Sequence, residues 1–224
     1  MVLTDHPSPN HDSREGQGID MLVLHYTGMQ TLEAAVARLT DPDAEVSAHY
    51  LVTESGGVIR LVDEGDRAWH AGVSSWRGAT NINARSIGVE IENPGHDFGY
   101  QPFPNIQMDA VAHLCGDILR RHAIPSRNVV GHSDVAPARK TDPGELFDWA
   151  RLAVSGIGIW PDRVAVPDPG KEFDAEAALA CVGYCVTDIR AALTAFQRHF
   201  YPSHITGVVD TRTCQRLACV LESL

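Results

Sequence analysis

One short loop near the middle of the chain brings together side chains of three chemical types. Residues 131–144 read GHSDVAPARKTDPG and contain His132, Lys140 and Asp142. The run 128–130 before them predicts a buried strand that delivers His132 at its end. Pro137 and Pro143 prevent the residues after His132 from forming a regular helix. Lys140 and Asp142 can therefore turn back toward this histidine. A mononuclear catalytic zinc takes three protein ligands and keeps one position for water, and this loop could supply two of the three.

A second histidine closes another apolar segment. Residues 19–26 predict a buried strand that ends on His25 and Tyr26. A lone histidine at such a position is most often a hydrogen-bonded core residue. The loop with His132 and Asp142 favours the other interpretation, a third metal ligand. His49, which falls inside the predicted strand 47–52, is interpreted as a structural residue or as a support for a ligand.

Two carboxylates lie on one face of a third predicted strand. In residues 86–93 the apolar side chains alternate with Glu90 and Glu92. A pair of this kind usually marks a solvated edge. The alternative is an acid/base site, because metal-assisted hydrolysis needs a carboxylate that takes a proton from water.

The segment 68–72 combines Trp69 and His70 with a glycine. Loops carry function, and a tryptophan ring offers a flat apolar face to a sugar or a peptide. The segment is therefore a candidate wall of a ligand site, and simple packing is the alternative.

Other elements must position these side chains. Residues 31–39 predict a helix capped by Thr31. Gly56 and Gly57 separate two predicted strands, 47–52 and 58–62, as a hairpin. The apolar spacing of 107–122 predicts a longer helix that ends before a proline, and 146–152 predicts a short one.

The last third of the chain has a different pattern. Residues 154–171 are rich in glycine and proline, lack periodicity and predict a linker. Three helical patterns follow at 175–181, 187–200 and 211–224, the middle one capped by Thr187. We therefore expect a first domain at 1–153 and a small helical domain at 172–224. Its four cysteines lack a C-x2-C pair and are interpreted as core residues.

Composition excludes several classes of function. The 224 residues are 44% hydrophobic and 21% charged, as in an ordinary globular protein. A formal net charge of -11 argues against nucleic acid or an anionic membrane as partner. No apolar run approaches the length of a membrane span. The substrate should be neutral, zwitterionic, or bound by local contacts.

The start of the chain and its cysteines bear on location. Residues 1–10 lack a basic segment followed by an apolar one, and 5–18 are polar and predict a surface lead-in. Five cysteines, an odd number, fit reduced thiols better than a disulfide framework. Both features favour the cytoplasm, with the periplasm as the alternative.

Taken together, these motifs resemble a known family. The segments 25–27, 46–50, 68–72, 86–90 and 131–144 are similar, in this order, to the zinc-dependent N-acetylmuramoyl-L-alanine amidases of type 2, the AmpD-like family related to peptidoglycan recognition proteins. The resemblance covers about residues 5–153. Residues 192–198 and 207–210 resemble the small helical peptidoglycan-binding domain often fused to these enzymes.

The resemblance implies an α+β fold with α/β-type layers: a central mixed β-sheet flanked by helices, plus a small all-α domain of three helices. It also implies a set of site residues, namely Zn2+ ligands His25, His132 and Asp142, a catalytic Glu90, and Lys140 as an electrostatic partner. Beside these we expect substrate contacts at Trp69, His70 and Tyr26. One departure is Ala48, where some relatives have a tyrosine, and it leaves proton transfer to Glu90.

The implied activity is zinc-dependent hydrolysis of the amide bond between N-acetylmuramic acid and L-alanine of the peptidoglycan stem peptide, in cell-wall degradation or recycling. The partners would be muropeptides, with the 1,6-anhydro sugar as one candidate. A non-catalytic peptidoglycan-recognition module is the alternative. The stem-peptide length and the oligomeric state are left open. A wall-binding domain has little use in the cytoplasm, so residues 172–224 are expected to act mainly as a packed structural appendage.

Overall fold

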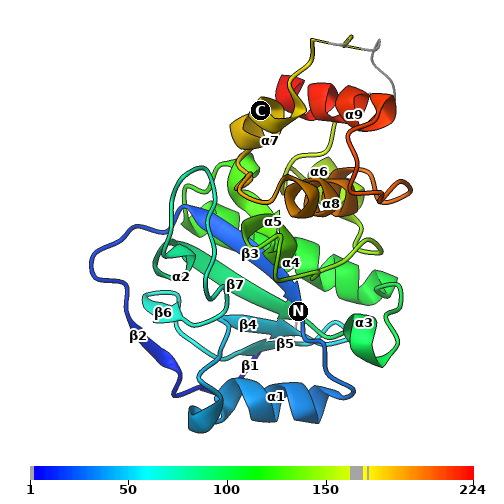
Figure 1. The fold of residues 1–224 in the computed structure, drawn as a ribbon. Helices are drawn as coiled ribbons and strands as arrows, with labels where there is room; N and C mark the ends of the chain where they lie inside the picture. The colour runs from blue at the N-terminus through cyan, green and yellow to red at the C-terminus, as the bar shows by residue number, and fades with distance from the viewer. Residues whose placement is uncertain (1–2, 162–168, 171) are drawn as a thin grey trace.

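The computed structural model in Figure 1 describes residues 3–161, 169–170 and 172–224. Its centre is a six-stranded mixed sheet in the order β1-β5-β4-β7-β3-β8. The β4–β5 hairpin is antiparallel, and every other neighbouring pair is parallel. The bounds along the sheet are β1 Leu3–Asp5, β5 Val58–Arg60, β4 Tyr50–Val52, β7 Ser86–Ile91, β3 Met21–Tyr26 and β8 Val129–Gly131. The expected α+β fold with a central mixed sheet is confirmed.

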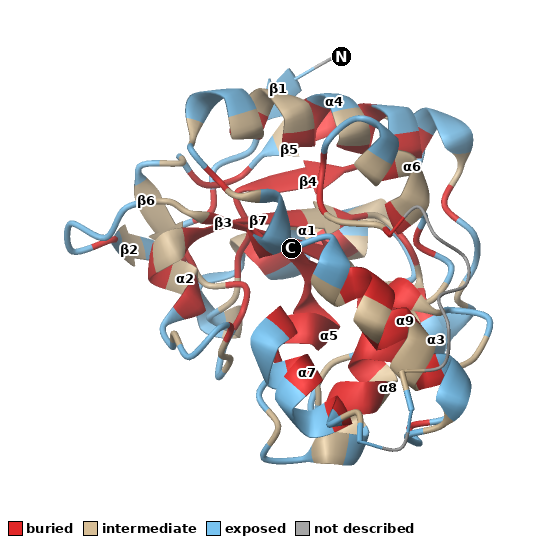
Figure 2. Ribbon diagram, turned by 90° about the horizontal axis from the view of Figure 1, so that it is seen from above, coloured by how far each residue is buried: buried red, intermediate tan, exposed pale blue. Residues whose placement is uncertain are grey.

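Helices cover both faces of this sheet. Leu22 and Leu24 of β3 point to the face packed by α4 (Asn105–Arg121), as the apolar spacing of that helix predicted. Met21 and Val23 point to the opposite face and join a second apolar cluster. Helix α1 (Leu32–Thr40) packs through its own small cluster on Leu51 and Leu61. The inner strands β3 and β7 are therefore buried except at Tyr26 and Glu90, which are partly exposed, and Figure 2 shows the buried residues in red.

Three C-terminal helices pack against the end of the sheet that carries β8 and the short helix α5 (His132–Val135) (Figure 1). They are α7 Ala175–Val182, α8 Ile189–Phe200 and α9 Thr211–Glu222. Their apolar residues share the cluster that contains Met21 and Val23 of β3. The helical unit therefore shares a core with the sheet. The division of the chain into two domains stays a prediction.

Some boundaries differ from the expected ones. Helix α8 begins after Asp188, whose carboxylate accepts the Ala191 N–H, so Asp188 and not Thr187 is the cap. Helix α6 covers Trp149–Val154, and the expected linker lies in part outside the described residues, at 162–168 and 171. The remaining short elements are the helices α2 Ile82–Arg85 and α3 Gly95–Phe98, with 3-10 turns at Pro42–Ala44 and Ser126–Asn128.

Most of the segment 5–18 lies at the surface, as expected, but it also contributes a strand and three buried polar residues, Ser8, Asn10 and Arg14. Strand β2 (His11–Ser13) pairs antiparallel with β6 (Asp66–Ala68), and neither strand has a clear apolar pattern. Arg14 is buried, and its guanidinium donates to the carbonyl oxygens of Glu64, Ala84 and Ser86. Because backbone carbonyls satisfy its guanidinium, this one polar side chain can be buried although the segment around it is mostly exposed.

No helix among the described residues combines the length and the apolar character needed to cross a membrane.

Candidate metal centre and active-site cleft

The register of three parallel strands creates the site. His25 of β3 lies beside Glu90 of β7, and Leu24 lies beside Gly131 at the end of β8. Neighbours in register point to the same face of a sheet. His132 follows directly on Gly131 as the first residue of α5. Residues from distant parts of the chain therefore meet at one edge, where the parallel strands end.

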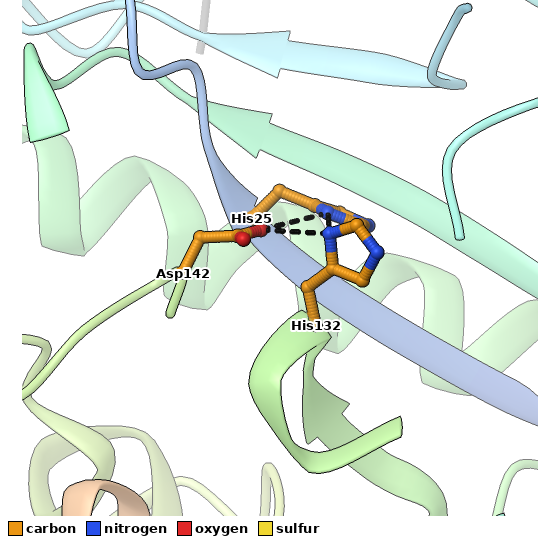
Figure 3. Close-up of side chains that lie close together, drawn as sticks. All are labelled: His25, His132 and Asp142. Atoms are coloured by element: carbon orange, nitrogen blue, oxygen red, sulfur yellow. Dashed lines mark hydrogen bonds and ion pairs between the residues drawn. The ribbon is translucent and has the colours of Figure 1, made fainter. Parts of the chain in front are cut away.

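Three potential ligand atoms converge at this edge (Figure 3). His25 Nδ1 lies 2.9 Å from His132 Nδ1, and each nitrogen lies 3.0 Å from Asp142 Oδ2. All three side chains are buried. The loop that carries Asp142 is held near α5 because the Ser133 N–H donates to the Asp142 carbonyl oxygen. The structure thus brings together the three residues expected as ligands. That they bind a metal stays a prediction.

The hydrogen bond of His132 determines which of its nitrogens is free. His132 Nε2 lies 3.1 Å from the carbonyl oxygen of Ala71. A carbonyl can only accept, so Nε2 carries the proton. In the neutral ring Nδ1 then presents a lone pair to the other two ligand atoms.

A series of hydrogen bonds determines which nitrogen of His25 carries the proton. The Ser86 hydroxyl donates to the Ile82 carbonyl, 2.7 Å away, and accepts from His70 Nε2 at 3.0 Å. His70 Nδ1 is then unprotonated and accepts from His25 Nε2 at 3.1 Å. Burial, with the neighbouring His132, lowers the pKa of His25 to about 4, and burial holds the pKa of His70 well below its usual range. Both rings are neutral at physiological pH, so His25 Nδ1 also presents a lone pair.

This arrangement fits a divalent metal ion. Two imidazole lone pairs and a carboxylate oxygen within 3.0 Å of one another repel unless a positive charge lies between them. Tetrahedral coordination with ligand distances near 2.0–2.1 Å would place the ligand atoms roughly 3.3 Å apart. The observed triangle is close to that size.

Glu90, beside His25 in the register of β3 and β7, is an acid that lines the cleft and is not a ligand candidate. Its Oε2 is buried and has no hydrogen-bond partner among the described residues. Burial, reinforced by the charge of Asp142 and opposed by Lys140, raises the pKa of Glu90 well above its usual range. Glu92, just past the end of β7, is different: its carboxylate accepts the Glu54 N–H at 2.7 Å and does not line the cleft.

A cleft of about 500 Å³ opens over these groups. Lys140 and Trp69 line it, as does Tyr26, whose hydroxyl lies 3.0 Å from His96 Nδ1 and 2.9 Å from Thr141 Oγ1. The wall also contains Arg38, Asp97 and Arg139. An acidic protein thus places several cationic side chains around this cleft.

His70 lines the cleft and lies directly against His25, and its role as a substrate contact stays a prediction. The side chain is 8% exposed, and both of its nitrogens are engaged by His25 and Ser86. A Cβ at Gly88 would lie 2.4 Å from the His70 ring, so only glycine leaves room for it there. His49 accepts the Gly88 N–H at 2.9 Å and is also buried. The sequence offered no signal for Ser86 or for the Ala71 carbonyl.

Comparison with known proteins decides the family. The family model described as N-acetylmuramoyl-L-alanine amidase matches residues 15–145, more than half of the chain. The chain belongs to this amidase family. It is 39% identical to the N-acetylmuramoyl-L-alanine amidase AmiD of Escherichia coli K12, over 91% of this chain and 83% of AmiD. It is 36% identical to the 1,6-anhydro-N-acetylmuramyl-L-alanine amidase AmpD of Enterobacter cloacae, over 65% of this chain and 86% of AmpD.

Solved amidase structures extend the similarity to the C-terminal helices. The E. coli AmiD complex with anhydro-N-acetylmuramic acid-L-Ala-D-γ-Glu-L-Lys has a TM-score of 0.81 and 37% identity, and the match covers 97% of this chain and 92% of AmiD. AmpDh3 of Pseudomonas aeruginosa has a TM-score of 0.82 and 33% identity, with 97% and 95% covered. The amidase family is thus confirmed, whereas the resemblance of residues 172–224 to a peptidoglycan-binding domain stays a prediction.

Proposed function

We propose that this amidase hydrolyses the amide bond between the lactyl group of N-acetylmuramic acid and L-alanine of the stem peptide. The observation that carries the proposal is the triangle of His25, His132 and Asp142 lone pairs beside Glu90, whose buried Oε2 has no hydrogen-bond partner in the described part of the chain. Water oxygen bonds to the carbonyl carbon, and the C–N bond breaks. The products are a lactyl carboxylate and the free amino group of L-alanine.

We propose zinc as the metal, held by His25, His132 and Asp142. Two imidazole nitrogens and one carboxylate oxygen are donors that zinc accepts in hydrolases, with the fourth position open. A bound zinc supplies Lewis-acid polarisation and lowers the pKa of a coordinated water toward ~7.

Glu90 is assigned the proton transfers. Its carboxylate lies beside His25 in register, and its Oε2 has no competing hydrogen bond among the described residues. A raised pKa lets the same group accept a proton from the attacking water and return it to the leaving nitrogen near neutral pH. Ala48 leaves no tyrosine to share this work.

Lys140 is assigned to charge stabilisation. It lines the cleft with the ligands, and its charge already acts on Glu90 and His25. An ammonium in a partly desolvated cleft stabilises the oxyanion that develops on the carbonyl oxygen. Trp69 and Tyr26 are proposed to contact the sugar and peptide, since both line the cleft and offer an apolar face with a polar edge.

The substrate is proposed to be a soluble 1,6-anhydro muropeptide, because AmiD was solved with such a molecule and the AmpD relatives carry it in their name. Purified protein is to be assayed side by side on the anhydro and the reducing-end muropeptide, with release of the L-alanine amino group as the readout. We expect faster turnover of the anhydro form. Binding without cleavage, in protein that holds no stoichiometric zinc, would instead identify a recognition module.

The proton chain behind His25 gives a prediction about metal affinity. Ser86→Ala removes the acceptor of the His70 Nε2 proton. This favours the His70 tautomer with the proton on Nδ1, which donates to His25 Nε2 and so leaves the His25 proton on Nδ1. We expect zinc affinity to fall by about 10- to 100-fold, measured by competition with a chelator. Ser47→Ala deletes an equally buried hydroxyl that bonds to Asn10 and Trp69 and is not connected to His25. An equal loss of zinc affinity in both variants would contradict the proposed role of the Ser86–His70–His25 hydrogen bonds.

We also propose a cytoplasmic location and a structural main role for the C-terminal helices. All five cysteines are free, and Cys181 and Cys185 are exposed, which fits a reducing compartment. Cell fractionation tests the location, and recovery in the periplasmic fraction would overturn it.

Co-sedimentation of the full chain with purified sacculi tests the structural role of the C-terminal helices. Saturable sedimentation would identify the helices as a wall anchor.

A further inference from the structure

The C-terminal helices reach the candidate metal centre through one buried carboxylate. Asp134 lies in α5, two residues after His132, and is 1% exposed. Its Oδ1 accepts the Tyr184 hydroxyl at 2.6 Å. Its Oδ2 accepts the Gly131 N–H and His199 Nδ1, each at 2.7 Å. Two of these three donors come from the C-terminal part of the chain.

Ring packing between the C-terminal part and the first part of the chain fixes both donors, Tyr184 and His199. The His199 ring of α8 stacks between Trp149 and Phe200, with ring centroids 3.9 Å away on each side. The Tyr184 ring packs edge-on against Trp76, with centroids 5.2 Å apart. Trp149 and Trp76 belong to the first part of the chain. These donors therefore cannot turn away from Asp134 without disrupting packing on both sides.

Asp134 in turn controls the backbone that presents two ligands. Its bond to the Gly131 N–H joins the end of β8 to the first turn of α5, where His132 begins. A Cβ at Gly131 would lie 2.7 Å from Pro143, the residue after Asp142. The Ser133 N–H also donates to the Asp142 carbonyl. A shift of Asp134 would thus move His132 and the loop of Asp142 together.

We propose that Tyr184 and His199 are positioning residues for the metal centre, acting through Asp134. The proposal rests on the proposed function only in taking His25, His132 and Asp142 as the zinc ligands. It makes the C-terminal helices a working part of the amidase site, in addition to any structural or wall-binding role. Groups that orient ligands in this way commonly change metal affinity by 10- to 100-fold when removed.

The test uses a double variant, Tyr184→Phe with His199→Phe, in the full chain. Phenylalanine keeps both rings in their stacks and removes only the two donors to Asp134. The matched control is Gln197→Met. Gln197 is fully buried in α8, the helix of His199. Among the described residues its side chain bonds to Thr206, Gly207, Val208 and Thr213, all in the C-terminal part of the chain. It should destabilise the helical unit without touching Asp134.

Zinc affinity by chelator competition and the visible spectrum of the cobalt-substituted protein are the readouts, beside the melting temperature. We expect the double variant to bind zinc about 10-fold more weakly, with a changed cobalt spectrum. The control should melt earlier with unchanged zinc affinity. His199→Asn, which keeps a donor near the Nδ1 position, should bind zinc more tightly than the single His199→Phe variant.

Unchanged zinc affinity in the double variant, or an equal loss in the control, would overturn the inference. If the double variant does not fold, Tyr184→Phe alone is compared with the control and must shift zinc affinity in the same direction. Failure of the proposed function looks different. In that case the double variant would still bind zinc more weakly than wild type, but the zinc-loaded wild-type protein would not cleave muropeptides.

Discussion

Replacing Glu90 with glutamine is expected to lower kcat by about 10²-fold or more while zinc content stays at the wild-type level. The amide has nearly the same shape but cannot take a proton from water. Because Glu90 is not among the converging ligand atoms, the metal should remain. Metal analysis and steady-state kinetics on a muropeptide measure the two quantities in one preparation.

The same substitution should stabilise the metal-free protein at neutral pH. Burial raises the folded-state pKa of Glu90 above its unfolded value. Its contribution to stability is therefore fully present below the unfolded pKa, about 4.3, and is lost as pH rises through the folded pKa. Glutamine has no ionisation to penalise. In chelator-treated samples the variant should melt higher than wild type at pH 7, and the gap should close toward pH 4.

Glu92→Gln is the matched control for both effects. It makes the same chemical change two residues along the chain, where the carboxylate already accepts the Glu54 N–H outside the cleft. We expect kcat within a few-fold of wild type and no gain in stability at neutral pH. If Glu92→Gln loses activity and Glu90→Gln keeps it, the base has been assigned to the wrong carboxylate.

Asp142→Asn is expected to remove the metal and to lower kcat/KM by about 10³-fold or more, since a metal supplies several kcal/mol of charge stabilisation in such reactions. The asparagine NH2 group can donate to the two Nδ1 lone pairs of His25 and His132, which now face Asp142 Oδ2 at 3.0 Å. The amide would then take the place of the cation. The metal-free variant should fold at least as stably as metal-free wild type.

Asp97→Asn removes one carboxylate from the same cleft without touching the converging atoms. Its zinc content should equal that of wild type. Stoichiometric zinc in Asp142→Asn, measured by elemental analysis after dialysis, would show that the metal is held elsewhere and would refute the ligand set.

The sequence by itself determined the chemistry and most of the elements around it. The apolar run that ends at His25, the strand before His132 and the helical spacing of α4 all appear where the pattern predicted them. These features are local, because alternation and helical spacing record which side of an element is buried. The types of ligand and their order along the chain were likewise visible, and with them the amidase family.

Only the tertiary structure decided how these residues meet. The pairing of His25 with Glu90 depends on strand register between segments far apart in the chain, which no local pattern encodes. The same holds for His70, which lies directly against His25, and for Arg14, whose burial depends on carbonyls 50 or more residues away. The Asp134 carboxylate likewise accepts hydrogen bonds from Tyr184 and His199, which lie 50 and 65 residues later in the chain. Such contacts form only when the whole chain has folded, because a buried polar group takes whichever partners the packing brings to it.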